Sequence, residues 1–263
     1  MEVPPAGDTG ILNLTALKTT EPNTEGHYST HIKTAFEDLY LNVRHKEGRF
    51  YTDEQVALLP NIELIHPYYH EWEMRKRSSD RLITYLEKKN RPLSILEIGC
   101  GNGWLSAKLA GLKDALVTGI DANLPEIEQA RRVFANSSVR FIYNSFNAES
   151  FGKYLKFDVI VFAASFQYFP SARAILQEAM QLLNPEGEVH IIDTHFYTAE
   201  DAKSSASRSK NYYSNMGVAE MSAHYFHHSL VGLEGFRYKI LFNPGNWLNR
   251  LSKKDVFYWV MIK

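Results

Sequence analysis

The stretch ILEIGCGNGW, Ile95–Trp104, decides the fold because it joins an apolar run to a turn with three alternating glycines. The apolar run predicts a short buried strand, and the glycines predict a turn that lets the backbone approach a ligand closely. A nicotinamide or flavin dinucleotide, a phosphate and other nucleotides all remain open as ligands of such a turn. The identity of this ligand determines most of the function.

Strand and helix patterns alternate on the C-terminal side of this turn. Strands are predicted at 94–99, 116–121, 139–146, 157–165 and 188–193, and helices at 104–112, 125–136 and 171–187. We expect Ser171 to cap the last helix, and Pro185 and Gly187 to end it. This alternation predicts an α/β fold with a doubly wound, mostly parallel sheet. Residues 237–244 and 255–263 follow with a short connection, so the last strand is predicted to run antiparallel.

Residues 1–90 are predicted to form an N-terminal extension, partly irregular and partly helical, and residues 91–263 to form the main domain. Residues 1–30 are rich in Pro, Thr, Gly and Asn, and we expect them to be loose. Helices are expected near Ile32–Leu41, after Thr52 or Asp53, and from His66-Pro67 onward. The cations of the third helix are expected mostly on the solvated surface; they are Arg75, Lys76, Arg77, Lys88 and Lys89.

Composition indicates a soluble globular protein. The 263 residues are 44% hydrophobic and 22% charged, which suffices for one sizeable core. A formal net charge of −1 without a basic stripe argues against nucleic-acid and membrane partners. Cys100 is the single cysteine, so an intramolecular disulfide is excluded. The start of the sequence lacks a signal-peptide pattern and no apolar run is long enough to span a bilayer, so we expect a cytoplasmic location.

The spacing of the glycines can be tested against known nucleotide-binding patterns. A dinucleotide fingerprint needs a third glycine at position 104, where Trp104 stands instead. A phosphate-binding P-loop needs a lysine that this turn lacks. Asp121, eighteen positions after Gly103, ends the second predicted strand. A carboxylate there suits a ribose diol, because it can accept hydrogen bonds from both hydroxyl groups.

Four segments together resemble the class I S-adenosylmethionine-dependent methyltransferase family. They are LEIGCGNG (96–103), GIDAN (119–123), FDVIVFAASFQYF (157–169) and LLNPEGEVHIID (182–193). The resemblance covers about Leu93–Thr194 and implies a Rossmann-like, seven-stranded sheet with an antiparallel final hairpin. It also implies S-adenosylmethionine as methyl donor and S-adenosylhomocysteine as product.

The resemblance assigns roles to particular residues around the donor. Glu97 is expected to hold the turn and the donor's amino group, Asp121 the ribose, and Arg75 the donor's carboxylate. Asn147 and Ala148 stand where the family commonly has an acid and a small residue beside the adenine. The full set of expected donor-binding residues is Arg75, Glu97, Gly99, Cys100, Gly101, Asn102, Gly103, Asp121, Ala122, Asn147, Ala148 and Ala163.

The acceptor side is expected to involve residues outside these motifs. His195 directly follows the fifth predicted strand and is a candidate base, and Tyr168 is a candidate aromatic contact of the sulfonium or a packing residue. Residues 196–236 are too long for a plain crossover and are expected to form a lid. His224 and His228 in it are spaced i, i+4, and with His227 they suggest a metal site, an acceptor pocket or plain packing; we predict no metal.

The sequence therefore predicts methyl transfer to a small-molecule acceptor by in-line displacement. A non-catalytic or regulatory S-adenosylmethionine-binding protein of the same fold is the alternative. A dinucleotide enzyme is disfavoured by Trp104. The acceptor, the methylated atom, the need for a base and the oligomeric state stay open.

Overall fold

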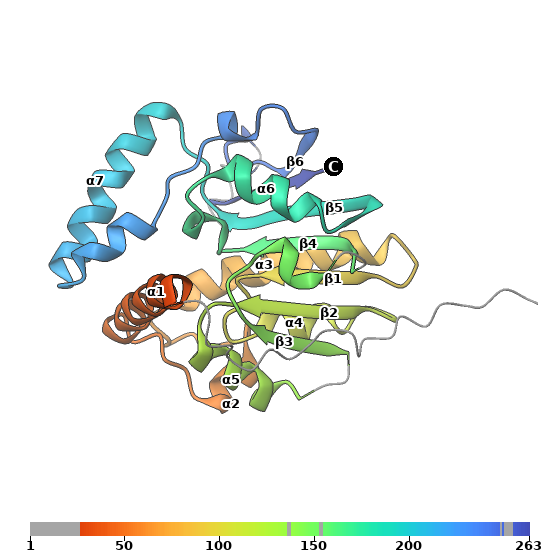
Figure 1. The fold of residues 1–263 in the computed structure, drawn as a ribbon, viewed down its shortest axis with the longest axis horizontal. Helices are drawn as coiled ribbons and strands as arrows, with labels where there is room; N and C mark the ends of the chain where they lie inside the picture. Colours follow the sequence, from red (N-terminus) through yellow and green to blue (C-terminus); the bar gives the residue numbers. More distant parts are fainter. Residues whose placement is uncertain (1–26, 136–137, 153–154, 248, 250–254) are drawn as a thin grey trace, which may run out of the picture.

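The computed structural model describes residues 27–135, 138–152, 155–247, 249 and 255–263. Within these residues a seven-stranded sheet forms the centre, with helices on both faces (Figure 1). The loose segment predicted for residues 1–30 lies outside the described residues as far as residue 26, and a helix begins at His27.

The sheet has the strand order β3-β2-β1-β4-β5-β7-β6. The strands are β1 (Ser94–Ile98), β2 (Leu116–Asp121), β3 (Val139–Tyr143), β4 (Phe157–Ala163), β5 (Leu183–Thr194), β6 (Tyr238–Phe242) and β7 (Tyr258–Ile262). Strands β1 to β5 pair in parallel, whereas β7 is antiparallel to both β5 and β6. The predicted mostly parallel sheet with an antiparallel last strand is confirmed.

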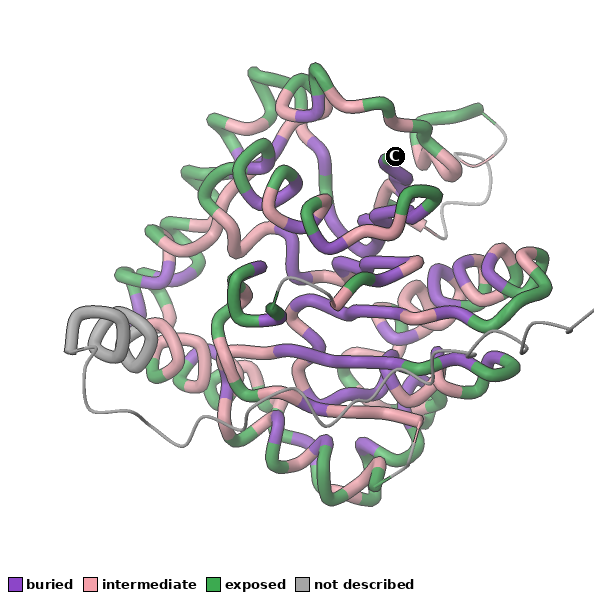
Figure 2. Tube along the Cα trace, turned by 45° about the vertical axis from the view of Figure 1, so that its right-hand side comes forward, coloured by how far each residue is buried: buried purple, intermediate pink, exposed green. Residues whose placement is uncertain are grey.

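Different helices cover the two faces of the sheet. They are α3 (Tyr69–Glu87), α4 (Trp104–Leu109) and α5 (Leu124–Val133) on one face, and α6 (Ala172–Met180) with the short η2 (Ala148–Phe151) and η5 (Leu230–Leu233) on the other. Successive strand residues point to opposite faces, so Ile191 packs on the α6 face and Ile192 on the α3 face. Both faces are buried, which explains the apolar runs of the central strands (Figure 2).

Three further helices lie at the end of the sheet to which the parallel strands point (Figure 1). They are α1 (His27–Lys46), α7 (Ala199–Asn215) and η4 (Ala219–His224). Val43 of α1 packs with Tyr213 of α7 and Met221 of η4, so this cluster bridges the start of the chain and the insertion after β5. The short helix α2 (Asp53–Leu58) is capped as predicted, because the Thr52 side chain accepts a hydrogen bond from the Gln55 backbone.

Several predicted element boundaries are wrong. Helix α6 is capped by Ser171 as expected but ends at Met180, well before Pro185 and Gly187. Strand β5 already begins at Leu183, which pairs with β4, and the pairing resumes at Glu188, so Pro185 and Gly187 lie in the irregular stretch between these two paired residues. Helix α3 begins at Tyr69 rather than around Pro67.

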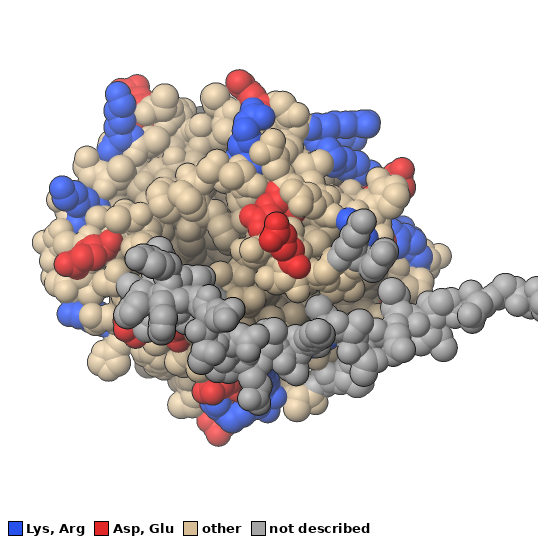
Figure 3. Space-filling view, in the orientation of Figure 1, with Lys and Arg blue, Asp and Glu red and all other residues tan. Residues whose placement is uncertain are grey.

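The surface carries charges of both signs. On the face drawn in Figure 3, basic and acidic side chains are interspersed rather than gathered into one patch. None of the helices in the described part of the chain is long and apolar enough to cross a membrane.

Candidate functional site

Two adjoining cavities open at the edge of the sheet where the parallel strands end. The smaller cavity has a volume of about 240 Å³ and the larger a volume of about 470 Å³. Both are lined by the glycine turn after β1, and they share Gly99, Gly101, Tyr40 and Tyr168. Open α/β sheets bind their ligands at this edge, so the pair of cavities is the candidate site.

The glycine turn packs tightly against other segments of the chain. Gly99 and Gly101 have φ of +75° and +52°, a region that favours glycine. A Cβ on Gly99 would lie 2.4 Å from Ser165 Cβ, and one on Gly101 would lie 2.5 Å from Glu126 Oε2. The glycines therefore allow the turn to pass beneath the end of β4 and the start of α5 while its backbone lines both cavities.

Asp121 ends β2 and lines the smaller cavity beside Ala122. Two backbone N–H groups hold its carboxylate, because Gly101 donates to Oδ2 and Asn123 to Oδ1, each at 2.8 Å. Burial, together with the Glu126 carboxylate, raises the pKa of Asp121 to about 7. The other lone pairs of this fixed carboxyl group can accept hydrogen bonds from hydroxyl groups of a ligand.

Glu97 of β1 lines the larger cavity and is only 2% exposed. The Ser106 hydroxyl of α4 donates a 2.5 Å hydrogen bond to its Oε2. Burial raises the pKa of Glu97 to about 8, and the nearby Asp121 carboxylate adds to the effect. A buried carboxyl group in this state favours a ligand that brings a positive charge.

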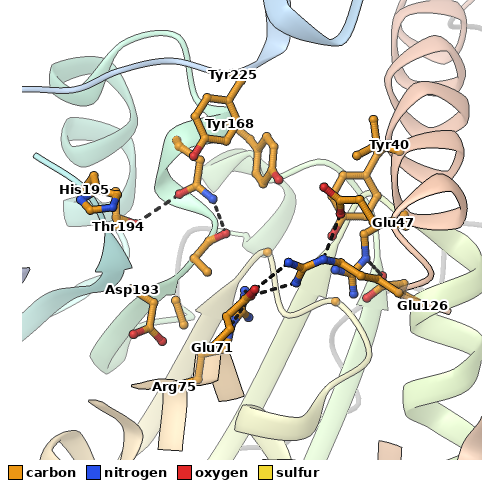
Figure 4. Close-up of a pocket in the computed structure, with 18 of the residues that line it drawn as sticks. Tyr40, Glu47, Glu71, Arg75, Glu126, Tyr168, Asp193, Thr194, His195 and Tyr225 are labelled. Atoms are coloured by element: carbon orange, nitrogen blue, oxygen red, sulfur yellow. Dashed lines mark hydrogen bonds and ion pairs between the residues drawn. The ribbon is translucent and has the colours of Figure 1, made fainter. Parts of the chain in front are cut away.

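Ion pairs form much of the wall of the larger cavity (Figure 4). Glu71 of α3 accepts two hydrogen bonds from Arg49, at 2.9 and 2.6 Å, and two from Arg75, at 3.1 and 2.8 Å. Burial raises the pKa of Glu71, but pairing with both arginines outweighs it and leaves the pKa at about 2. Arg44 of α1 lies 3.5 Å from Glu126 of α5. Arg75 therefore lies at the cavity, where its expected role at the donor needs it, and not on the solvated surface expected for most cations of this helix.

The two candidate catalytic residues also line these cavities. Tyr168 stands between them, and its ring is in edge contact with Phe36 and Tyr40 of α1, at centroid distances of 5.9 and 5.8 Å. His195 follows β5 at the larger cavity, with its ring 4.7 Å from that of Phe257. Partial burial lowers the pKa of His195, so its imidazole is neutral at pH 7 and able to accept a proton.

The structure brings most of the predicted site residues together. The larger cavity is lined by Arg75, Glu97, Cys100, Asn102, Ala163 and His195, the smaller by Asp121 and Ala122, and both by Gly99, Gly101 and Tyr168. Burial raises the pKa of the Cys100 thiol, which opposes a role as nucleophile.

Three predicted donor-binding residues line neither cavity. A Cβ on Gly103 would lie 2.6 Å from the Phe141 ring, so this glycine serves the packing of α4 on β3. Asn147 caps η2 through its side chain, and the Ala148 backbone donates to Glu178. The same part of the smaller cavity is lined instead by the residues just before them, Asn144, Ser145 and Phe146.

Sequence reasoning missed several residues of the site. Asp193 lines the larger cavity, and its position at the end of a parallel strand was an available signal. Tyr40 and Arg44 reach the site from α1, far away in sequence, and no local pattern marks them. Glu126 lies in the first turn of α5, and the sequence predicts only that it belongs to a helix.

The three histidines of the insertion have different contacts. η4 ends at His224, so His224 and His228 do not share a helix face. His227 Nε2 lies 3.0 Å from Ser209 Oγ, and His228 Nε2 lies 3.2 Å from the Phe166 carbonyl oxygen. Among the residues that the structure describes, no group of three or more His, Cys, Asp or Glu side chains could hold a metal ion.

The strand order, the glycine turn and the acidic residue after β2 define a Rossmann-like α/β protein with its site at the carboxyl edge of the sheet. Residues 95–187 match the family described as methyltransferase domain. The matched residues make up about a third of the chain and include the glycine turn and Asp121.

Individual relatives are distant. The chain is 31% identical over 118 residues to a ubiquinone biosynthesis O-methyltransferase of Glaesserella parasuis; the match covers 41% of this chain and 50% of that protein. The chain thus spans about half the length of the curated relatives it matches, or less.

Two solved structures share the fold. Magnesium protoporphyrin IX methyltransferase from Synechocystis PCC 6803 with bound S-adenosylhomocysteine has 15% identity and a TM-score of 0.54, over 89% of this chain and 99% of that one. The plantazolicin methyltransferase BpumL, in complex with a triazolic desmethylplantazolicin analogue and S-adenosylhomocysteine, has 19% identity and a TM-score of 0.53, over 90% and 98%.

Proposed function

We propose that this protein binds S-adenosylmethionine and transfers its methyl group to a small-molecule acceptor. One observation carries the proposal: the smaller and larger cavities meet at Gly99, Gly101 and Tyr168. This arrangement suits a ligand built from a nucleoside and an amino acid, and S-adenosylmethionine is such a ligand. Solved relatives with S-adenosylhomocysteine bound on the same fold support the choice.

The nucleoside half of the donor fits the smaller cavity. There Asp121 is the partner for the ribose hydroxyls, and Ala122 and Phe146 offer apolar surface to the adenine. The amino-acid half fits the larger cavity, because Glu97 is a buried carboxyl group that lacks a cationic partner among the described residues. Arg75 is the proposed partner of the donor's carboxylate.

S-adenosylmethionine supplies a methyl group activated by a positively charged sulfur. The residues of this chain contribute position and exclusion of water, which are the main requirements of an in-line displacement. Tyr168 offers an aromatic ring at the junction of the two cavities, suited to a cationic centre. The neutral imidazole of His195 is the proposed base where the acceptor must lose a proton.

Acceptor selection is proposed to lie with the N-terminal extension and the insertion at about 196–236. Tyr40 and Arg44 of α1 face the larger cavity from one side, and Tyr212 and Tyr213 of α7 from another. The methyltransferases named above carry the names of ubiquinone biosynthesis, magnesium protoporphyrin IX and plantazolicin, which supports a small-molecule acceptor.

Titration calorimetry with S-adenosylhomocysteine tests the proposal. The wild type should give a clear isotherm, and Asp121→Ala should weaken binding by roughly a hundredfold, because two hydrogen bonds to a charged group are lost. Asp53→Ala is the control, since Asp53 is an exposed partner of Arg132 away from both cavities. A wild type that does not bind contradicts the proposal, and binding without turnover on any acceptor favours the non-catalytic alternative.

A further inference from the structure

A bulge near the end of β5 turns Asp193 toward the larger cavity. The register between β5 and β7 shifts between Ile191 and Thr194. Because Ile191 packs on the α6 face and Ile192 on the α3 face, strict alternation would place Asp193 in the apolar α6 layer. Asp193 instead adopts φ of +53°, and its carboxylate meets Ser78 of α3. Bulges redirect side chains in this way beside functional sites.

The environment of Asp193 holds the carboxyl group in place but leaves it incompletely satisfied. Asp193 is 6% exposed, and Ser78 Oγ donates a 2.6 Å hydrogen bond to its Oδ1. Across the described residues, Oδ2 has no hydrogen-bond partner, and the residue lines the larger cavity. A left-handed backbone is uncommon for a residue other than glycine, and such strain beside a cavity points to function rather than to packing.

Most charged groups of the larger cavity already have partners. Glu71 is paired with Arg49 and Arg75, and Glu126 with Arg44. Glu47 is paired with Arg49 and also accepts a hydrogen bond from Tyr212. An anionic acceptor, in addition to the donor's carboxylate, would therefore have to compete for arginines that are already engaged.

Arg208, the other guanidinium at this cavity, is exposed on α7 and donates to two serine hydroxyls. Its exposure places it at the rim, where water screens its charge.

Glu97 and Asp193 are the buried exceptions, since no cation of the described chain lies within ion-pair distance of either. Burial raises the pKa of Asp193 to about 6, although Arg75 and Arg81 oppose this from a greater distance. Two buried carboxyl groups of the larger cavity thus lack a cation. The proposed donor brings one ammonium group, for which Glu97 is the partner. Asp193 is therefore left without a cationic partner when the donor is bound.

The order of the two carboxyl groups along the sheet fits this division. Glu97 pairs with Val161 of β4, which pairs with His190 of β5. Asp193 lies beyond His190 in the chain direction, so it is nearer to the carboxyl edge of the sheet. The donor's amino acid thus occupies the deeper position, and the acceptor reaches Asp193 from the mouth.

We propose that Asp193 binds the protonated amino group of the methyl acceptor, and that the acceptor is an amine. The inference rests on the proposed function. In the transfer, the bound ammonium group first gives one proton to the neutral His195, which passes it to water, and this frees the nitrogen lone pair. The lone pair then forms the N–CH₃ bond while the S–CH₃ bond breaks and its electron pair stays on sulfur. Tyr168 and Tyr225, in edge contact at 5.8 Å, add aromatic surface for a cation.

The test uses three probes of one shape and different charge: benzylamine, benzyl alcohol and benzoate. Their binding to the protein saturated with S-adenosylhomocysteine is measured by NMR titration. Benzylamine should bind at least roughly tenfold more tightly than the other two, and Asp193→Asn should abolish this preference. Asp114→Asn is the matched control, because Asp114 has a similar φ of +56° but is exposed and lines neither cavity. Ser78→Ala should reduce the preference in part.

The outcomes separate this inference from the proposed function. Equal binding of the three probes, a preference for benzoate, or a benzylamine preference that survives Asp193→Asn would overturn the amine assignment alone. A loss of S-adenosylhomocysteine affinity greater than about threefold in Asp193→Asn would also overturn it, because it would put Asp193 at the donor. A wild type that does not bind S-adenosylhomocysteine would refute the proposed function itself.

Discussion

Strand β5 carries two buried carboxyl groups with opposite environments. Glu188, 2% exposed, is surrounded by cations: Lys89 Nζ lies at 2.7 Å and Lys263 Nζ at 3.1 Å. Asp193, 6% exposed on the same strand, has a hydrogen bond from Ser78 and no cation within ion-pair distance among the described residues.

The pKa values follow this difference. Burial alone would raise the pKa of Glu188, but its hydrogen bonds to His190 and the two lysines hold it far below the usual range. For Asp193, burial prevails and raises the pKa to about 6. A buried charge that is fully paired joins elements of the fold, here α3, β5 and β7. A buried charge without a partner marks a place for a ligand.

The pairing around Glu188 extends into a small polar network. Trp259 Nε1 donates to His190 Nδ1 at 3.0 Å, so the neutral ring carries its proton on Nε2, which faces Glu188 at 3.4 Å. Burial lowers the pKa of His190 and keeps the ring neutral. The sequence context suggested a solvated Lys89, but the structure directs its ammonium group to Glu188.

The largest expected effect is on stability. Glu188→Gln should lower the free energy of unfolding by roughly 3 kcal/mol, because it leaves two lysines beside an uncharged group, one of them largely buried. Urea denaturation of wild type and variant at pH 7 measures this. A loss below about 1 kcal/mol would contradict the proposed difference between the paired carboxylate of Glu188 and the unpaired carboxyl group of Asp193.

Asp193→Asn should instead raise the free energy of unfolding of the ligand-free protein. The folded pKa of about 6 lies above the ordinary value for aspartate, so the folded state binds more protons and stability falls as pH rises between these two values. Asparagine removes this penalty, so the variant should be more stable than wild type by roughly 1–2 kcal/mol at pH 7, with little difference at pH 4. Thermal unfolding at both pH values measures it; a variant that is less stable at pH 7 contradicts the account.

A smaller effect is expected from Tyr85→Phe. The Tyr85 hydroxyl lies 3.1 and 3.2 Å from the two carboxylate oxygens of Glu188, so its removal deletes one charge-assisted hydrogen bond. Because both lysines remain, the free energy of unfolding should fall by only about 1 kcal/mol. Its dependence on pH at acidic pH should change only slightly. A loss as large as that of Glu188→Gln would show that the lysines contribute little.

Much of the fold was predictable because its signals are local. The apolar run of β1, the glycine turn and Asp121 lie within about 30 residues of one another, and Trp104 at the position of the third glycine disfavours a dinucleotide site. By contrast, Asp193 reaches the cavity through a bulge that depends on pairing with β7, at the other end of the domain sequence. No alternation pattern predicts such a bulge.

Other errors share this cause. Pro185 and Gly187 predict a helix end, but they lie between Leu183 and Glu188, which both pair with β4, and so belong to an irregular part of β5. The spacing of His224 and His228 has meaning only on a helix, and the chain leaves the helical path between them. Tyr40 and Arg44 join the site because α1 folds over the carboxyl edge of the sheet, which no local pattern reveals.

We propose that the unpaired carboxyl groups at this edge of the sheet bind positively charged groups of a ligand. Calorimetry of S-adenosylhomocysteine binding at pH 7, in two buffers with different heats of ionisation, tests it most directly. Glu97, with a pKa of about 8, is mostly protonated before binding, so an ammonium partner should release at least about half a proton per site. In Glu97→Gln, binding should be weaker and this release should fall. Binding of the wild type without proton release, or no binding at all, would contradict the account.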